Sequence, residues 1–149
     1  MAEALVSTVI DAPVDVVWDR FGDFNGWPRF LPRMVSSELE GGTGRGPVGA
    51  VRVIGLSDGR SIRERLVDYD ATERTLAYEF DGPHPFPVRT YRGRVRLWPV
   101  TATGQTFVAW TGTFDADGGD EARAEEMFVQ TYSAFLRSLS EHLAGSVVG

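Results

Sequence analysis

The sequence predicts an α+β fold in which a curved antiparallel sheet of seven strands wraps around a long C-terminal helix, with two short helices after the first strand. Three observations lead to this prediction: a β-branched run near the start, alternating polar and apolar residues over residues 33–115, and a helical apolar period over residues 121–145. Strands and helices do not alternate along the chain, so a doubly wound parallel sheet is not expected.

The composition narrows the classes of function. All 15 basic residues are arginine, cysteine is absent and the two histidines lie far apart. The sequence therefore excludes lysine Schiff-base chemistry, thiolate catalysis and a histidine-rich metal site. We expect neither a metal nor another cofactor. A net charge of -6 argues against nucleic acid as the main partner.

Length and hydropathy indicate one domain over residues 1–149, since 42% hydrophobic content suffices for a single core. The N-terminus lacks a basic and apolar leader, and no apolar run approaches the roughly 18 residues of a membrane span. We therefore expect a cytoplasmic protein without a membrane span, either a monomer or a homodimer.

The start of the chain predicts one strand and two short helices. Residues 4–10 are rich in β-branched side chains, and the run stops at residues 11–13, where Pro13 suits the first turn of a helix. Apolar residues then recur at i, i+3, i+4 and i+7 over residues 14–21, which indicates a short helix. A second helical piece, broken by a proline, is expected over residues 23–31, with Trp27 and Phe30 as buried anchors.

Residues 33–115 predict six strands joined as a meander, because turn residues separate the alternating segments. The turns are expected at residues 41–47, 57–59, 70–73, 82–87 and 101–104. The alternation is clearest in residues 91–97, where three arginines share one face and apolar or small residues share the other. One face of the sheet is therefore expected to be buried and the arginine-rich face to be solvated.

The C-terminal helix is expected to start after Asp120, a suitable N-cap, and to end near Gly145. At about 1.5 Å per residue it would be roughly 36 Å long, enough to cross the concave face of the sheet. Its apolar side comprises Met127, Phe128, Thr131, Tyr132, Phe135, Leu139 and Leu143. A single helix on a strongly curved sheet leaves a gap, and we place the candidate site there.

The hairpin around residues 57–59 decides which side chains face that gap. A three-residue turn with Gly59 in the left-handed conformation would place Arg52 opposite Glu64, both on the inner face. A two-residue turn would shift the parity and separate the two charges. We favour the first, because it leaves the arginines that flank Glu64 in solvent.

Arg52 and Glu64 are the best candidates for chemistry, because a charge removed from water is costly unless it is paired. One hypothesis makes Glu64 a hydrogen-bond acceptor or general base for a ligand, with Arg52 as its orienting partner or as an anion contact. The other makes them a half-exposed ion pair at the rim of the sheet. The sequence leaves both open.

Apolar and aromatic side chains that would share the gap form the candidate ligand-binding set. Together with Glu64, this set comprises Trp27, Phe30, Ile54, Ile62, Tyr78, Tyr91, Trp110, Phe128, Tyr132 and Phe135. Aromatic residues at such spacings are often plain core, whereas a buried tyrosine hydroxyl needs a partner. Gly93 and Gly112 lie inside strands, where they permit either sheet curvature or the close approach of a bulky group.

A proline-rich loop over residues 82–87 lies at one open end of the predicted sheet. It would present His84 and Phe86 at the mouth of the gap. The loop is either a gate or a rigid surface turn.

These elements resemble the SRPBCC or START-like superfamily, which includes the birch-pollen allergen proteins, bacterial polyketide cyclase/dehydrases and plant abscisic-acid receptors. The resemblance rests on residues 10–18, 27–32, 48–52 and 64–66, on Asp70 and on the terminal helix, and it covers nearly the whole chain. It implies a helix-grip fold with a ligand cavity between the sheet and the helix.

The local similarity is to the abscisic-acid receptors, through residues 48–52 and 64–66, the loop that holds His84, and Tyr91. This similarity implies pocket positions for Glu64, Tyr91 and the His84 loop. The chain departs from the receptors in having proline at the positions of the hormone-anchoring lysine and the latch arginine.

Two hypotheses for the function follow. The first is binding of a hydrophobic small molecule, polyketide-like or lipid-like, between the sheet and the helix. The second is a polyketide cyclase, aromatase or dehydratase in which Glu64 or Tyr132 moves protons and Arg52 stabilises an enolate oxygen. A third, a ligand-gated protein-interaction module, is disfavoured by the short loop at residues 56–60.

Overall fold

The computed structural model describes residues 1–41 and 48–148, and its elements follow the predicted order. The elements are β1 (Ala2–Ile10), α1 (Val14–Phe21), the 3-10 helix η1 (Phe24–Arg29), β2 (Met34–Leu39), β3 (Val51–Leu56), β4 (Ser61–Asp70), β5 (Thr75–Phe80), β6 (Thr90–Val100), β7 (Gln105–Asp115) and α2 (Glu121–Val148). Of the turn predicted at residues 41–47, residues 42–47 lie outside the described part of the chain.

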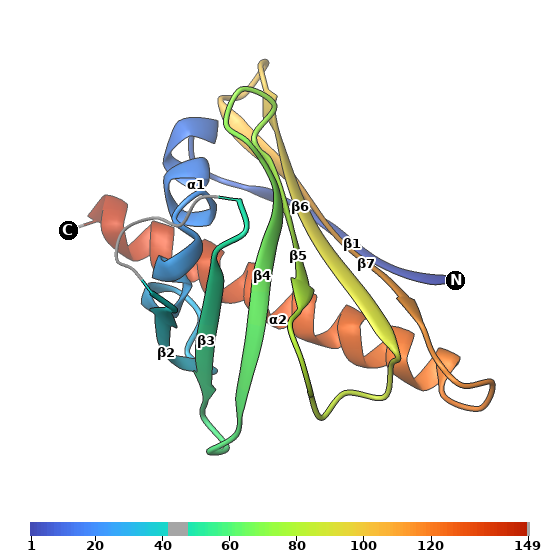
Figure 1. Ribbon diagram of the computed structural model, residues 1–149. Helices are drawn as coiled ribbons and strands as arrows, with labels where there is room; N and C mark the ends of the chain where they lie inside the picture. Colours follow the sequence, from blue (N-terminus) through green and yellow to red (C-terminus); the bar gives the residue numbers. More distant parts are fainter. Residues whose placement is uncertain (42–47, 149) are drawn as a thin grey trace.

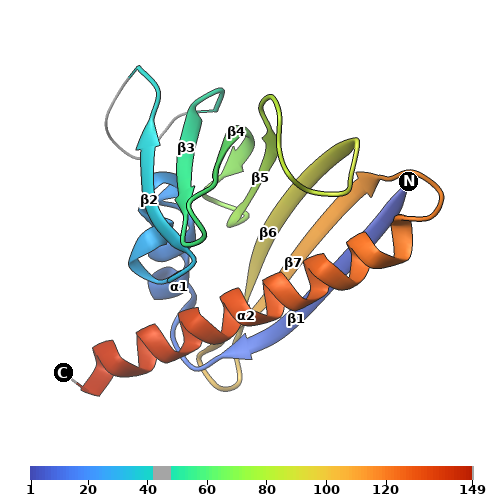
Figure 2. The ribbon, with the colours of Figure 1, turned by 90° about the horizontal axis from the view of Figure 1, so that it is seen from below.

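The seven strands form one antiparallel sheet in the order β1-β7-β6-β5-β4-β3-β2. Strands β2 to β7 follow one another as a meander, and β1 closes the sheet by pairing with β7, so that Val6 lies opposite Trp110. Register shifts in β2 and in β4 mark irregularities that bend these strands. The sheet is strongly curved, and α2 runs across its open side (Figures 1 and 2). The predicted α+β architecture is therefore confirmed.

The outer face of the sheet carries paired charges. Arg92, Arg94 and Arg96 alternate with buried residues along β6, as predicted. Their guanidinium groups contact Glu79 at 2.7 Å, Asp68 at 2.9 Å and Glu73 at 3.0 Å. Each arginine thus meets a carboxylate, and this face is a solvated array of ion pairs.

Helix α2 extends to Val148, slightly beyond the predicted end. Its buried stripe comprises Ala124, Phe128, Tyr132, Leu136, Leu139 and Leu143. Ala124 and Leu136 were missing from the predicted apolar side. Met127, Thr131 and Phe135, which the prediction merged with that stripe, are only half-buried and form a second row beside it. The helix therefore presents two adjacent surfaces to the sheet.

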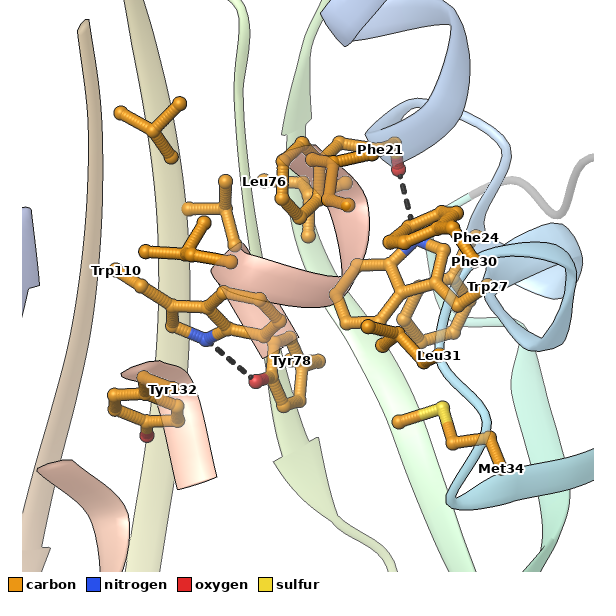
Figure 3. Packing of buried hydrophobic residues seen from close by; sticks show 14 of the residues in the cluster. Phe21, Phe24, Trp27, Phe30, Leu31, Met34, Leu76, Tyr78, Trp110 and Tyr132 are labelled. Atoms are coloured by element: carbon orange, nitrogen blue, oxygen red, sulfur yellow. Dashed lines mark hydrogen bonds between the residues drawn. The ribbon is translucent and has the colours of Figure 1, made fainter. Parts of the chain in front are cut away.

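One end of the concave face is filled with aromatic rings. Phe21 from α1, Trp27 from η1 and Trp110 from β7 meet edge to face, with ring centroids 5.5–5.7 Å apart. The indole N–H of Trp27 donates to the carbonyl oxygen of Phe21 at 3.1 Å (Figure 3). The two short helices therefore close this end with a packed core, which we call the filled end.

Among the described residues, no helix combines the length and the apolar character that crossing a membrane requires.

Candidate functional site

A cavity of about 290 Å³ lies between the concave face of the sheet and α2. Its apolar lining comprises Met34, Leu56, Ile62, Tyr78, Phe80, Phe86, Tyr91, Met127, Phe128, Thr131, Tyr132 and Phe135. Glu64 is the buried carboxylate among these walls, and four exposed polar residues border the remainder: Arg33, Ser57, Asp58 and Arg60. Helix α2 supplies one wall through its half-buried row and through Phe128 and Tyr132 of the buried stripe.

The β3–β4 hairpin sets the side of the sheet on which the charged candidates lie. Gly59 has φ +90°, its N–H donates to the carbonyl of Leu56, and the N–H of Leu56 donates to the carbonyl of Arg60. Arg52 lies opposite Glu64. The three-residue turn is therefore confirmed, and both charges lie on the inner face.

Arg52 and Glu64 form a buried ion pair. The Nε and Nη2 atoms of Arg52 donate to Oε1 of Glu64 at 3.1 and 2.6 Å, and Nη1 donates to the carbonyl of Phe24. The guanidinium carbon lies 3.7 Å from the ring centroid of Phe24 and 4.0 Å from that of Trp27. The exposed fractions of the two side chains are 0% and 6%. The interpretation as a half-exposed rim pair is wrong.

The two partners differ in their access to the cavity. Glu64 lines it, whereas Arg52 lies behind Glu64, between the rings of the filled end. Both contacts from Arg52 go to Oε1, and Oε2 accepts no hydrogen bond from the described residues. A direct contact of Arg52 with a bound anion or enolate is therefore at odds with this geometry, whereas a role in orienting Glu64 agrees with it.

Three tyrosine hydroxyls form a hydrogen-bonded chain at the cavity wall. The indole N–H of Trp110 donates to the hydroxyl of Tyr78 at 3.0 Å (Figure 3). The hydroxyls of Tyr78 and Tyr91 are 3.4 Å apart, and the hydroxyl of Tyr91 also bonds that of Tyr132. Burial raises the pKa of all three phenols, so they stay protonated at neutral pH.

Gly93 and Gly112 lie opposite each other in β6 and β7, and the tyrosine chain explains both. A Cβ atom at Gly93 would lie 2.3 Å from Cζ of Tyr78, and one at Gly112 would lie 2.3 Å from the hydroxyl oxygen of Tyr132. Of the two roles that the sequence left open, close approach is the one observed here. The bulky groups are side chains of the protein itself.

The predicted ligand-binding set divides along the concave face. Those that line the cavity are Ile62, Glu64, Tyr78, Tyr91, Phe128, Tyr132 and Phe135. Those that are buried in the core and do not line it are Trp27, Phe30, Ile54 and Trp110. Alternation identified the inner face correctly, but it cannot tell how far along a strand the two short helices cover that face.

Some lining residues were missed by the sequence reasoning. Phe80 follows from the strand register, since it lies directly opposite Glu64. Met127 and Thr131 were on the predicted apolar side of the helix but were not assigned to the site. Leu56 lies on the inner face that the three-residue turn predicts but was not assigned to the site, and Met34 had no signal beyond ordinary strand patterning.

The two predicted gate residues have different places. Phe86 lines the cavity, whereas His84 lies over Phe80, with ring centroids 4.4 Å apart, and borders a neighbouring groove. The Nδ1 atom of His84 accepts the backbone N–H of Phe86 at 3.2 Å. Burial lowers the pKa of His84, so its neutral form, which can accept this bond, is favoured. Gating itself stays a prediction.

The chain is similar to several proteins of known structure. XoxI from Bacillus cereus is 32% identical, and the match covers 95% of this chain and 94% of that one, with a TM-score of 0.83. The di-domain ARO/CYC BexL from the BE-7585A biosynthetic pathway is 21% identical, covers 97% of this chain and 47% of that one, and has a TM-score of 0.82. Major latex-like protein 151 from Panax ginseng is 19% identical, with coverages of 95% and 96% and a TM-score of 0.78.

No curated protein matches the chain. The likeness to BexL and to the ginseng protein supports the helix-grip fold. The family model described as polyketide cyclase / dehydrase and lipid transport matches residues 1–144. The resemblance to the SRPBCC or START-like superfamily is thereby confirmed, and the chain belongs to the polyketide cyclase / dehydrase and lipid transport family.

Proposed function

We propose that this protein reversibly binds a compact hydrophobic small molecule in the cavity between the sheet and α2. The observation that carries the proposal is the cavity itself, about 290 Å³ between aromatic and aliphatic walls, with one buried carboxylate. Ligand pockets usually hold roughly 300–1,000 Å³ and combine apolar walls with few polar groups. This volume favours a ligand of one or two fused rings, or a short acyl chain.

Support for a defined ligand position comes from Glu64. Its Oε1 atom is held by Arg52, and its Oε2 atom has no hydrogen-bond partner among the described residues. Because an apolar ligand would remove Oε2 from water without giving it a partner, a ligand hydroxyl at Oε2 would gain more than the same group at an apolar wall. Arg52 acts here as a positioning residue.

The alternative is a cyclase, as the name of BexL suggests for that protein. Glu64 supports this alternative, since a carboxylate in an apolar cavity is suited to remove a proton from a carbon between two carbonyls. The resulting enolate carbon would attack a further carbonyl carbon of the same chain, whose π bond opens to an alkoxide, and protonated Glu64 would return its proton to that oxygen. The position of Arg52 argues against its stabilising that enolate directly.

Filling the cavity tests the binding function. Thr131→Trp would place an indole into the cavity from the half-buried row of α2, whereas Gln130→Trp adds the same group on the exposed side of the helix. Binding of prodan, a neutral naphthalene ketone whose emission depends on polarity, is measured by titration. We expect saturable binding that Thr131→Trp weakens at least about tenfold and Gln130→Trp leaves unchanged. Equal binding by both variants would contradict the proposed site.

Catalysis is tested separately with a linear poly-β-keto thioester and analysis of the products. Cyclisation that is faster with the protein than without it, and is lost in Glu64→Gln, would establish the alternative. If Glu64→Gln changes the affinity for the compound and no cyclised product forms with either protein, binding is the whole function.

A further inference from the structure

The three tyrosine hydroxyls of the cavity wall have more protons to donate than there are hydrogen bonds between them. Tyr78, Tyr91 and Tyr132 each carry one hydroxyl proton, and the hydroxyl-to-hydroxyl contacts are those from Tyr78 to Tyr91 and from Tyr91 to Tyr132. Two contacts use two protons. Whichever way the chain runs, one hydroxyl proton has no acceptor among the described residues, and all three tyrosines line the cavity.

The bond from Trp110 favours one direction of the chain. An indole N–H can only donate, so the oxygen of Tyr78 is the acceptor in their 3.0 Å contact. In only one arrangement does every phenol oxygen then accept a single bond: Tyr78 donates to Tyr91, and Tyr91 donates to Tyr132. The unused proton is then that of Tyr132, and burial keeps it on the oxygen by raising the pKa of that phenol.

Glu64, in contrast, offers the cavity a hydrogen-bond acceptor. Its Oε2 atom is an acceptor without a partner among the described residues, and its counter-ion Arg52 lies outside the cavity. A second anion beside Glu64 would be repelled, and the two arginines that border the cavity do not offset this, because Arg33 and Arg60 are exposed and Arg60 already pairs with Asp58. Besides the hydroxyl of Thr131, the interior of the cavity thus offers one hydrogen-bond acceptor, at Glu64, and one hydrogen-bond donor, at Tyr132.

Resting on the proposed binding function, we infer that the ligand is a neutral hydroxy-carbonyl compound, whose hydroxyl donates to Oε2 of Glu64 and whose carbonyl oxygen accepts from the hydroxyl of Tyr132. Each end of such a ligand satisfies a buried group that an apolar molecule of the same shape would leave unsatisfied. This complementarity gives selectivity among compounds that fill the cavity equally well.

The test separates the two polar contacts with three probes that share one apolar body: naphthalene, 2-naphthol and 2-acetylnaphthalene. Their affinities are measured by displacement of prodan. We expect 2-naphthol to bind about tenfold tighter than naphthalene, since its hydroxyl meets a charged acceptor. The ketone is expected to bind about fivefold tighter than naphthalene, since its partner is a neutral hydroxyl.

Two variants assign these gains to their residues. Tyr132→Phe is expected to remove the gain of the ketone and keep that of the naphthol. Glu64→Gln is expected to reduce the gain of the naphthol to about twofold and keep that of the ketone. Because Glu64→Gln leaves Arg52 without a counter-ion, the double variant Arg52→Met/Glu64→Leu replaces the ion pair with apolar groups and repeats the measurement.

Matched controls lie elsewhere on the sheet. Tyr69 is the tyrosine outside the cavity, where it packs on Trp18, and Glu73 pairs with Arg96 on the outer face. Tyr69→Phe and Glu73→Gln are expected to leave all three affinities unchanged. A change in either control as large as that in the cavity variants would overturn the assignment.

The outcomes distinguish the inference from the proposed function. If all three probes bind with equal affinity, the cavity binds ligands and the inference is overturned. If prodan and the probes all fail to bind, both are overturned. A ketone gain that survives Tyr132→Phe and is lost in Tyr78→Phe would overturn the direction of the hydroxyl chain and the choice of Tyr132.

Discussion

The two ends of the concave face use the same kind of side chain with opposite results. At the filled end, three rings pack edge to face with one another: Phe21, Trp27 and Trp110. At the other end, which we call the hollow end, Tyr91 lies nearly parallel to Phe80 and Phe128, with centroids 4.7 and 4.6 Å apart. These stacked rings line a wall without filling the space in front of it.

The difference comes from the elements around each end. Helices α1 and η1 supply rings from a third direction at the filled end, whereas the hollow end is covered by α2 and the loop that holds Phe86. Large side chains on the sheet are therefore not sufficient to fill the space that its concave face encloses. The cavity persists because too few elements converge on that end.

The largest effect is expected from truncation at the filled end. Phe21→Ala should lower the free energy of unfolding by about 3–5 kcal/mol, because it opens a cavity in a closely packed core. Phe86→Ala, at the hollow end, should lower it by less than about 1 kcal/mol, since that ring already borders open space. Urea unfolding of both variants checks this, and equal losses would contradict the contrast between the ends.

The ion pair at the boundary of the two ends should give the next largest effect. Arg52→Met leaves Glu64 buried without a partner and should cost about 3 kcal/mol in the free energy of unfolding. Adding Glu64→Leu should restore stability to within about 1 kcal/mol of the wild type. Arg92→Met, which breaks an exposed pair, should cost less than about 1 kcal/mol. A double variant no more stable than Arg52→Met would contradict this account.

A smaller loss of stability is expected at the strand glycines that lie against the tyrosine chain. Gly93→Ala places a methyl group against the ring of Tyr78 and should cost about 2 kcal/mol, measured by thermal and urea unfolding. Tyr78→Leu in the same chain should recover part of the loss by removing the ring. Gly118→Ala, whose added carbon meets no atom within 4 Å, is the control and should change stability little.

The smallest effect should come from the histidines: His84 lies over Phe80 at the hollow end, and His142 of α2 lies against Phe30, which contacts Phe21 of the filled end. Burial lowers the pKa of His84, and burial together with Arg20 and Arg29 lowers that of His142, so folding favours the neutral forms. The unfolded chain then binds more protons, and stability should fall as the pH drops below the ordinary value of 6.5. Urea midpoints at pH 7.5 and 5.5 measure the fall.

His84→Gln and His142→Gln should each reduce that fall. Hydrogen exchange at the amide of Phe86 reports the hollow end separately, because that N–H donates to His84. The quantity to compare is the protection factor, the intrinsic exchange rate divided by the observed one, and it is expected to be smaller at lower pH in the wild type. A protection factor that falls equally in His84→Gln would show that another group is responsible.

Much of the site could be predicted because it rests on local geometry. The turn at Gly59 follows from three residues, and it alone sets the parity that brings Arg52 and Glu64 together on the inner face. Alternation likewise identified Tyr78 and Tyr91 as inward. What could not be predicted was which inward residues reach the cavity. Ile54 and Ile62 lie opposite each other on the same face, yet of the two only Ile62 lines the cavity.

The sequence by itself determined the order of the elements and the inner face of each strand, and it favoured the pairing of Arg52 with Glu64 without deciding whether the pair is buried. These depend on the periods of neighbouring residues and on turn lengths, which act within a few positions of the chain. Only the tertiary structure decided which end of the sheet is hollow, why Gly93 and Gly112 are glycines, and how the hydroxyls of Tyr78, Tyr91 and Tyr132 connect. Such relations join segments that are distant along the chain, and no local pattern encodes the distances between them.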